Sequence, residues 1–181
     1  MHVYFVQDFS YTWIIELKKQ MNDIIVRKHS GINTLYARLI MQEELDVIWD
    51  FFTDPENLSV ITPPEMRFKI TSPVLHNPVF PGQIISYKIN VLPGIRMNWV
   101  TEITHLIDRQ LFVDEQRIGP YSFWHHKHLF RKHEEGIEIV DEVTYKLPFG
   151  VAFLNPILIR PQLIKIFRFR SRKLKELFPD K

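Results

Sequence analysis

The chain has 181 residues, of which 45% are hydrophobic, 13% aromatic and 24% charged, with six glycines, no cysteine and a formal net charge of +2. This composition is typical of a single packed globular domain and excludes an intrinsically disordered chain. The lack of cysteine excludes disulfides and thiolate metal sites, so any metal ion would have to bind histidine and carboxylate side chains.

The sequence indicates neither a membrane-spanning helix nor a signal peptide. The sequence contains no run of about 18 apolar residues, which a membrane-spanning helix would need. The first thirty residues lack the basic start and apolar block of a signal peptide. We therefore expect a cytoplasmic protein.

The first predicted element is an amphipathic helix over Ser10–His29, where apolar residues recur at helical spacing and Gly31 follows as a C-cap. Three interpretations remain open for it. It could dock on the domain or on a second copy, lie on a membrane surface, or be a translated leader outside the functional unit. Residues 1–31 are thus expected to form an N-terminal helical extension, and residues 32–181 the main domain.

The main domain begins with a strand over Thr34–Met41, which alternates apolar and polar residues, and a helix over Glu43–Phe52. Asp54 and Pro55 then open a short helix, because Pro fits a first helical turn and the Asp side chain can cap free amides. Six extended segments follow, separated by Gly or Pro turns or short polar links. They are Met66–Ser72, Gln83–Val91, Arg96–Leu106, Gln110–Ile118, Tyr121–Arg131 and Ile137–Leu147.

The last predicted element is a long helix over Pro156–Phe178 that starts or kinks at Pro161. Residues 156–181 carry eight Lys or Arg and two acidic residues, a net charge of +6, which leaves −4 on the preceding 155 residues. The basic charge is therefore a local feature, and nucleic-acid binding by the whole chain is not expected. The order of elements predicts an α+β fold.

Short turns between the last four strands fix which residues lie opposite each other. The predicted pairs are Ile103 with Asp114, Thr101 with Gln116, Asp114 with His126, Gln116 with Trp124, His128 with Asp141 and Trp124 with Tyr145. These pairs place His126 and His128 on the inner face and His125 on the outer, charged face, so the three histidines in the stretch WHHKH do not form one cluster.

The predicted inner face is unusual for a core because it mixes aromatic side chains with ionisable ones. Its members are Trp99, Thr101, Ile103, Phe112, Asp114, Gln116, Ile118, Trp124, His126, His128, Phe130, Ile139, Asp141, Val143 and Tyr145. A buried polar group without a partner costs roughly 1–3 kcal/mol, so these groups must pair with each other, with water or with a ligand. Polar groups set in an aromatic wall are typical of a ligand cavity.

Several runs of residues resemble a known superfamily. The runs are FVDEQRIGPYSFWHHKHLF, DEVTYKLPFG, TDPENLSVITPP and WVTEITH, together with the basic C-terminal helix. Between about Thr34 and Phe178 the chain resembles an uncharacterised ligand-binding branch of the SRPBCC, or START/Bet v 1-like, superfamily, some members of which are labelled cell-division inhibitors. The resemblance implies a helix-grip fold, in which a curved antiparallel sheet of about seven strands wraps a long C-terminal helix and leaves a cavity. Superfamily relatives bind lipids, sterols, polyketides or plant hormones, and some convert their ligands.

The preferred functional hypothesis is binding of a hydrophobic small molecule of lipid-, polyketide- or sterol-like type. Its walls would be Trp99, Trp124 and Tyr145, and its polar anchors Asp114, Gln116, His126, His128 and Asp141. The alternative is a polyketide cyclase- or dehydratase-like enzyme, in which Asp114 orients His126 as acid and base and Tyr145 donates to the ligand.

A metal site and a lipid contact are the remaining hypotheses. His126 and His128 could bind Zn²⁺ or Fe²⁺ with Asp114 or Asp141, but each histidine has a carboxylate partner, so we expect no metal and no cofactor. A basic stripe on the last helix is either its solvated back or a contact with anionic lipid head groups; its members are Lys165, Arg168, Arg172, Lys173 and Lys175. Nucleic acid is not expected as a partner, because the aromatics that would stack on bases face inward. A monomer and a homodimer are both compatible with the sequence.

Overall fold

The computed structural model describes residues 24–73 and 77–180. Its framework is an eight-stranded antiparallel sheet in the order β1-β2-β8-β7-β6-β5-β4-β3. The strands are β1 Ile25–His29, β2 Ile32–Met41, β3 Lys69–Ile70, β4 Ile84–Leu92, β5 Ile95–Ile107, β6 Leu111–Ile118, β7 Phe123–His133 and β8 Gly136–Lys146. The helical elements are α2 Leu45–Thr53, η1 Pro55–Ser59, η2 Pro64–Met66, η3 Ala152–Leu154, η4 Asn155–Ile159 and α3 Arg160–Leu177.

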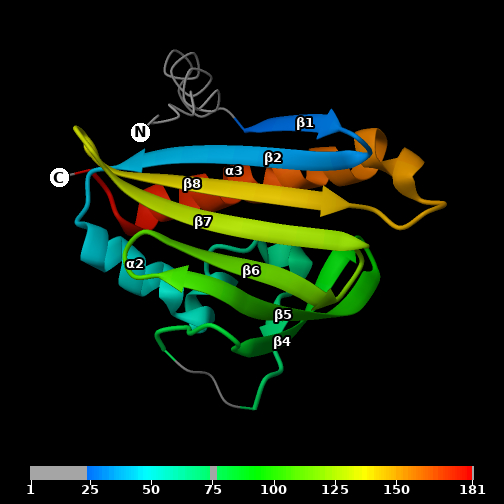
Figure 1. The fold of residues 1–181 in the computed structure, drawn as a ribbon, viewed down its shortest axis with the longest axis horizontal. Coiled ribbons are helices and arrows are strands. Elements are labelled where there is room, and N and C mark those ends of the chain that lie inside the picture. The colour runs from blue at the N-terminus through cyan, green and yellow to red at the C-terminus, as the bar shows by residue number, and fades with distance from the viewer. Residues whose placement is uncertain (1–23, 74–76, 181) are drawn as a thin grey trace, which may run out of the picture.

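The long helix α3 lies behind the sheet, along β2 and β8 (Figure 1). Its buried residues are Leu163, Phe167, Arg170 and Leu174, which recur every three or four positions and so form one stripe. Pro161 fits the first turn, where its missing N–H is not needed. This arrangement is the helix-grip α+β fold expected from the sequence.

Two clusters of apolar residues fill the space between the sheet and the helices. One joins the first half of α3, through Leu163 and Phe167, to Leu35 and Val143 on the middle strands. The other and larger cluster includes Ile48 and Trp49 of α2, and the Trp49 ring meets Phe130 edge-on at a centroid distance of 5.3 Å. Residues of both clusters line a cavity.

The predicted helix over Ser10–His29 is wrong in its last five residues, which form β1 and pair with β2. Ser30 and Gly31 have φ values of 47° and 79°, and two successive positive φ values make the tight turn that matches the twist of a hairpin. Gly31 therefore turns a hairpin instead of capping a helix, and the boundary expected at residue 31 falls inside that hairpin. Residues 10–23 of the predicted helix lie outside the described part of the chain.

Three other predictions need smaller corrections. The strand expected over Met66–Ser72 is reduced to Lys69–Ile70, because Pro64 starts a 3-10 turn that ends at Arg67 with a φ of 44°. The short helix after Asp54 is a 3-10 helix, and Asp54 caps it by accepting from the Glu56 amide. Ile118, expected on the inner face, is 60% exposed at the end of β6. Among the described residues, no helix is long and apolar enough to cross a membrane.

Candidate functional site

The predicted strand register is confirmed for five of its pairs. Ile103 pairs with Asp114, Thr101 with Gln116, Asp114 with His126, His128 with Asp141 and Trp124 with Tyr145. The ladder between β6 and β7 ends at Glu115 and His125, so the predicted pair of Gln116 with Trp124 lies one step beyond it.

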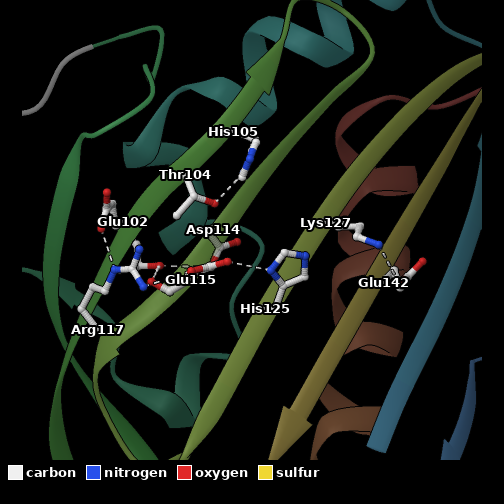
Figure 2. A network of polar contacts seen from close by, with 10 residues as sticks. Glu102, Thr104, His105, Asp114, Glu115, Arg117, His125, Lys127 and Glu142 are labelled. Atoms are coloured by element: carbon white, nitrogen blue, oxygen red, sulfur yellow. Dashed lines mark hydrogen bonds and ion pairs between the residues drawn. The ribbon is translucent and has the colours of Figure 1, made fainter.

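His125 lies on the outer face of the sheet, as predicted. Its Nδ1 atom is 2.8 Å from Glu115 Oε1, within a ladder of charged side chains that crosses the strands (Figure 2). Arg117 donates to Glu102 in the same ladder, and Lys127 donates to Glu142. This face is a solvated charge network, separate from the two inward histidines.

His126 and His128 are buried and share two carboxylates between them. His126 Nε2 lies 2.9 Å from Asp141 Oδ1, and its Nδ1 lies 3.2 Å from Asp114 Oδ2. His128 Nε2 is hydrogen-bonded to Asp114 Oδ2 at 3.0 Å, and its Nδ1 lies 2.9 Å from Asp141 Oδ1. Each imidazole thus contacts both acids, whereas the strand register predicted one separate partner for each histidine.

Arg170 completes the network from α3. It is 7% exposed, and its Nη1 atom donates to Asp141 Oδ1 at 2.9 Å. Sequence reasoning missed this residue because it assigned the basic residues of the helix mostly to the solvent side. The signal was present, since Arg170 falls on the stripe that runs from Leu163 through Phe167 to Leu174.

The charged groups in the network strongly shift one another's pKa values. Burial alone would raise the pKa of the Asp114 carboxyl, but the adjacent His126 and His128 bring it below its usual value. Burial also acts to raise the pKa of Asp141, yet Arg170 and the two imidazoles bring it well below normal. For His126, burial acts to lower the pKa, but Asp114 and Asp141 raise it above the ordinary value. When His126 is protonated, it adds a positive charge to that of Arg170 opposite the two carboxylates.

A cavity of about 170 Å³ lies against this network, between the sheet, α3 and the η1–η2 region. Of the residues predicted for the site, Trp99, Asp114, Trp124, His126 and His128 line it. Helix α3 contributes a further wall from Gln162, Leu163, Ile166, Phe167 and Arg170. The remaining lining is mostly aliphatic and aromatic, and it includes Tyr87, which stacks on Trp99.

The other three predicted site residues lie outside the cavity lining. Asp141 contacts both histidines and Arg170. The Tyr145 hydroxyl donates to Asn155 Oδ1 at 2.9 Å, and Asn155 in turn donates to Asn33. Gln116 holds the β6–β7 turn, because its side chain bonds both the N–H and the C=O of Tyr121. The polar side-chain atoms of Gln116, Asp141 and Tyr145 thus have partners within the protein.

Gly119 explains how Gln116 reaches Tyr121. A Cβ atom at Gly119 would come within 2.3 Å of Gln116 Oε1, so any larger residue would displace the amide. Tyr121 lines the cavity and packs at 4.7 Å against Trp124. The Gly-Pro turn in the stretch GPYSFWHHKHLF therefore positions one wall of the cavity.

Three buried side-chain nitrogens in the described part of the chain have no hydrogen-bond partner, and all three belong to residues that line the cavity. They are Trp99 Nε1, Arg170 Nε and His128 Nδ1. His128 Nδ1 lies close to Asp141, but not at the angle of a hydrogen bond. The indole and guanidinium nitrogens can only donate. Unpaired buried donors are rare in native proteins and call for a physical explanation.

The cavity wall also contains the donor set considered for a metal. Asp114, His126 and His128 each offer a ligand atom, and the three atoms lie within 4.8 Å of one another. A metal ion would have to replace the hydrogen bond between His128 and Asp114 and stand near the Arg170 charge. The absence of a metal stays a prediction.

No protein-family model matches the sequence, and no curated protein matches it. Solved structures are similar in fold over most of the chain. The protein Ms6760 from Mycobacterium smegmatis has a TM-score of 0.58 at 17% identity, covering 84% of this chain and 95% of its own. A protein from Arthrobacter aurescens has a TM-score of 0.63 at 12% identity, covering 84% and 91%. Major latex-like protein 151 from Panax ginseng has a TM-score of 0.59 at 11% identity, covering 83% and 99%. At these identities the likeness shows the fold alone.

Proposed function

Because the chain has the helix-grip fold of the SRPBCC, or START/Bet v 1-like, superfamily, we propose that it binds a small, largely apolar molecule in the cavity between the sheet and α3. The observation that carries this proposal is the pair of unpartnered donors, Trp99 Nε1 and Arg170 Nε, on residues of the cavity wall. A ligand that accepts a hydrogen bond would satisfy a group that otherwise destabilises the folded protein.

The chemistry of the wall defines the ligand class. Trp99 and Arg170 offer only donors at these atoms, so the ligand presents an acceptor oxygen, such as a carbonyl, ether or carboxylate. The rest of the wall is built from rings and aliphatic chains, among them Tyr87, Trp124 and Phe167. An aromatic or aliphatic body with one polar end would match both parts.

The size of the cavity favours the smaller members of the expected ligand range. Its volume of about 170 Å³ is close to the roughly 150 Å³ apolar cavity that binds benzene. It is below the range of about 300–1,000 Å³ that is typical of pockets for larger organic ligands. A sterol or a long polyketide would therefore need α3 or the η1–η2 region to move outward.

The enzyme alternative has less support. A general base needs a nitrogen that can face the ligand, but both His126 nitrogens lie within 3.2 Å of carboxylates. The Tyr145 hydroxyl, expected to donate to a ligand, donates to Asn155 instead. The same contacts suit a fixed polar wall that orients a ligand.

The proposal is tested with two probes of nearly equal shape, acetophenone, which has a carbonyl oxygen, and α-methylstyrene, which has a CH₂ group in its place. We expect ligand-observed NMR to show that the wild type binds acetophenone more tightly, by about 1–3 kcal/mol, the scale of one buried hydrogen bond. Trp99→Phe keeps the ring wall but removes the donor, so it should narrow that difference. Equal affinity for both probes in the wild type would count against the donor hypothesis, and binding of neither would count against the cavity as a ligand site.

A further inference from the structure

The connection between β8 and α3 exposes a group of large apolar side chains. Phe149 is 106% exposed, Ile157 75% and Phe153 67%. Val151 and Leu158 are also exposed, at 39% and 37%. These five residues, here called the apolar tip, lie within ten positions of one another. Several exposed apolar side chains on one short segment are typical of a site that contacts a partner or a lipid.

The apolar tip is held in this exposed position by the fold. Phe153 lies on η3 and Ile157 and Leu158 on η4, while Phe149 and Val151 lie in the turn before η3. Asn155, between Phe153 and Ile157, accepts from Tyr145 and donates to Asn33 at 3.0 Å. Tyr145 is fully buried and Asn33 is 6% exposed, so the anchor is tied to β8 and β2. Figure 1 shows the connection, in orange, projecting beyond the ends of the neighbouring strands. The apolar side chains therefore point into solvent from a fixed base.

The charged residues that border the apolar tip along the chain are basic. From Lys146 to Arg160 the sequence has no acidic residue, and both of these end residues are exposed. Lys28 is exposed on the same end of the sheet, because it pairs with Asn33, which in turn pairs with Tyr145 next to Lys146. A projecting apolar segment with a basic margin is the pattern that complements an anionic lipid surface.

A second copy of the chain fits this surface less well. A two-fold contact would bring the same basic margin together from both copies. A stable interface also needs about 800 Å² from each partner, whereas the apolar tip is a short protruding segment. A bilayer interface can take up apolar side chains one by one, and its anionic head groups would lie against the basic side chains next to the tip.

We propose that the apolar tip inserts into the surface of an anionic lipid bilayer, with Lys28, Lys146 and Arg160 at the head groups. This is a peripheral contact and does not depend on a ligand in the cavity. The next residue after the tip, Ile159, lines the cavity. Docking would therefore bring one end of the cavity to the membrane surface.

The test is co-sedimentation of the full chain with vesicles of phosphatidylcholine alone and of equimolar phosphatidylcholine and phosphatidylserine. The wild type should bind the mixed vesicles more tightly and lose that preference in high salt. Replacing Phe149 and Phe153 together by serine should weaken binding about tenfold or more, since both rings lose their apolar contact. Lys146→Glu with Arg160→Glu should weaken binding to the mixed vesicles only.

The matched control is Ile107→Ser, which removes a side chain that is 49% exposed at the turn between β5 and β6, at the opposite end of the strands. It should leave vesicle binding unchanged. Thermal unfolding should be similar for all variants, because every substituted side chain is exposed. Failure of the wild type to bind either vesicle would overturn the proposal, as would an equal loss in Ile107→Ser. A wild-type dimer in sedimentation that the Phe149 and Phe153 variant abolishes, without vesicle binding, would assign the tip to a second copy instead.

Discussion

At the scale of single residues, the buried network depends on one proton at His126. Asp114 and Asp141 raise the pKa of this imidazole despite its burial, and His128 and Arg170 are the other ionisable groups that contact the same carboxylates. When His126 is protonated, its charge adds to that of Arg170 opposite the two carboxylates. Loss of that proton removes one positive charge from the contacts of Asp114 and Asp141.

This proton predicts a pH dependence of stability. A raised pKa in the folded state means that His126 stabilises the fold fully below its unfolded pKa of about 6.5, and that this contribution is lost as pH rises through the folded value. The free energy of unfolding of the wild type minus that of His126→Gln, from denaturant titrations, should therefore shrink as the pH rises above about 6.5. The carboxylates act in the opposite sense, since their lowered pKa values make them stabilising above about pH 4. A difference that stays constant or grows towards alkaline pH would contradict the charge assignment.

At the scale of elements, Arg170 fastens α3 to the sheet through a charge contact inside the core. Removing Arg170 leaves the buried Asp141 carboxylate with only the two imidazoles as partners, and a buried charge that loses its ion-pair partner is strongly destabilising. We therefore expect Arg170→Met to lower the free energy of unfolding by about 3–5 kcal/mol. Arg168→Met, at an exposed position of the same helix, should change it by less than about 0.5 kcal/mol. Chemical denaturation of both variants measures the contrast, and equal effects would show that Arg170 does not fasten the helix.

The elements that could be predicted from the sequence are those whose apolar residues recur at a clear spacing and that are joined by short turns. The pairing of β5 to β8 was predictable because tight turns leave little freedom in register, and this placed His126 and His128 inside. The strand β1 was not predictable in the same way. Ile24 and Ile25 fit a helical repeat, and a glycine at position 31 is compatible with either a helix end or a hairpin turn. The structure has the hairpin, with positive φ values at both Ser30 and Gly31.

The candidate site was predictable only in part, for a physical reason. Register shows which residues lie opposite each other, but side-chain length decides which atoms meet. His126 therefore contacts Asp141 as well as Asp114, and Gln116 turns towards Tyr121. Contacts from α3, such as that of Arg170 with Asp141, depend on how the helix lies across the sheet. Neither period nor turn length contains that information.

At the scale of the whole molecule, the cavity and the apolar tip lie next to each other along the chain. The tip ends at Leu158, and Ile159 and Gln162 line the cavity. Gln162 also donates to the Val91 carbonyl on β4. This hydrogen bond connects the start of α3 to a strand near the β3 edge of the sheet. The proposed ligand site and the proposed lipid contact would thus form one continuous region of the molecule.

The central claim is that the cavity holds a small molecule, and native mass spectrometry of the chain purified from its own cells tests it most directly. The matched variants are Ile89→Phe, which adds atoms to a residue of the cavity wall, and Ile107→Phe, which adds the same atoms at an exposed turn. The wild type and Ile107→Phe should carry a bound small molecule that is lost on denaturation, and Ile89→Phe should carry little or none. A wild type with no bound mass, or a bound mass that Ile89→Phe retains in full, would contradict the cavity as the site of binding.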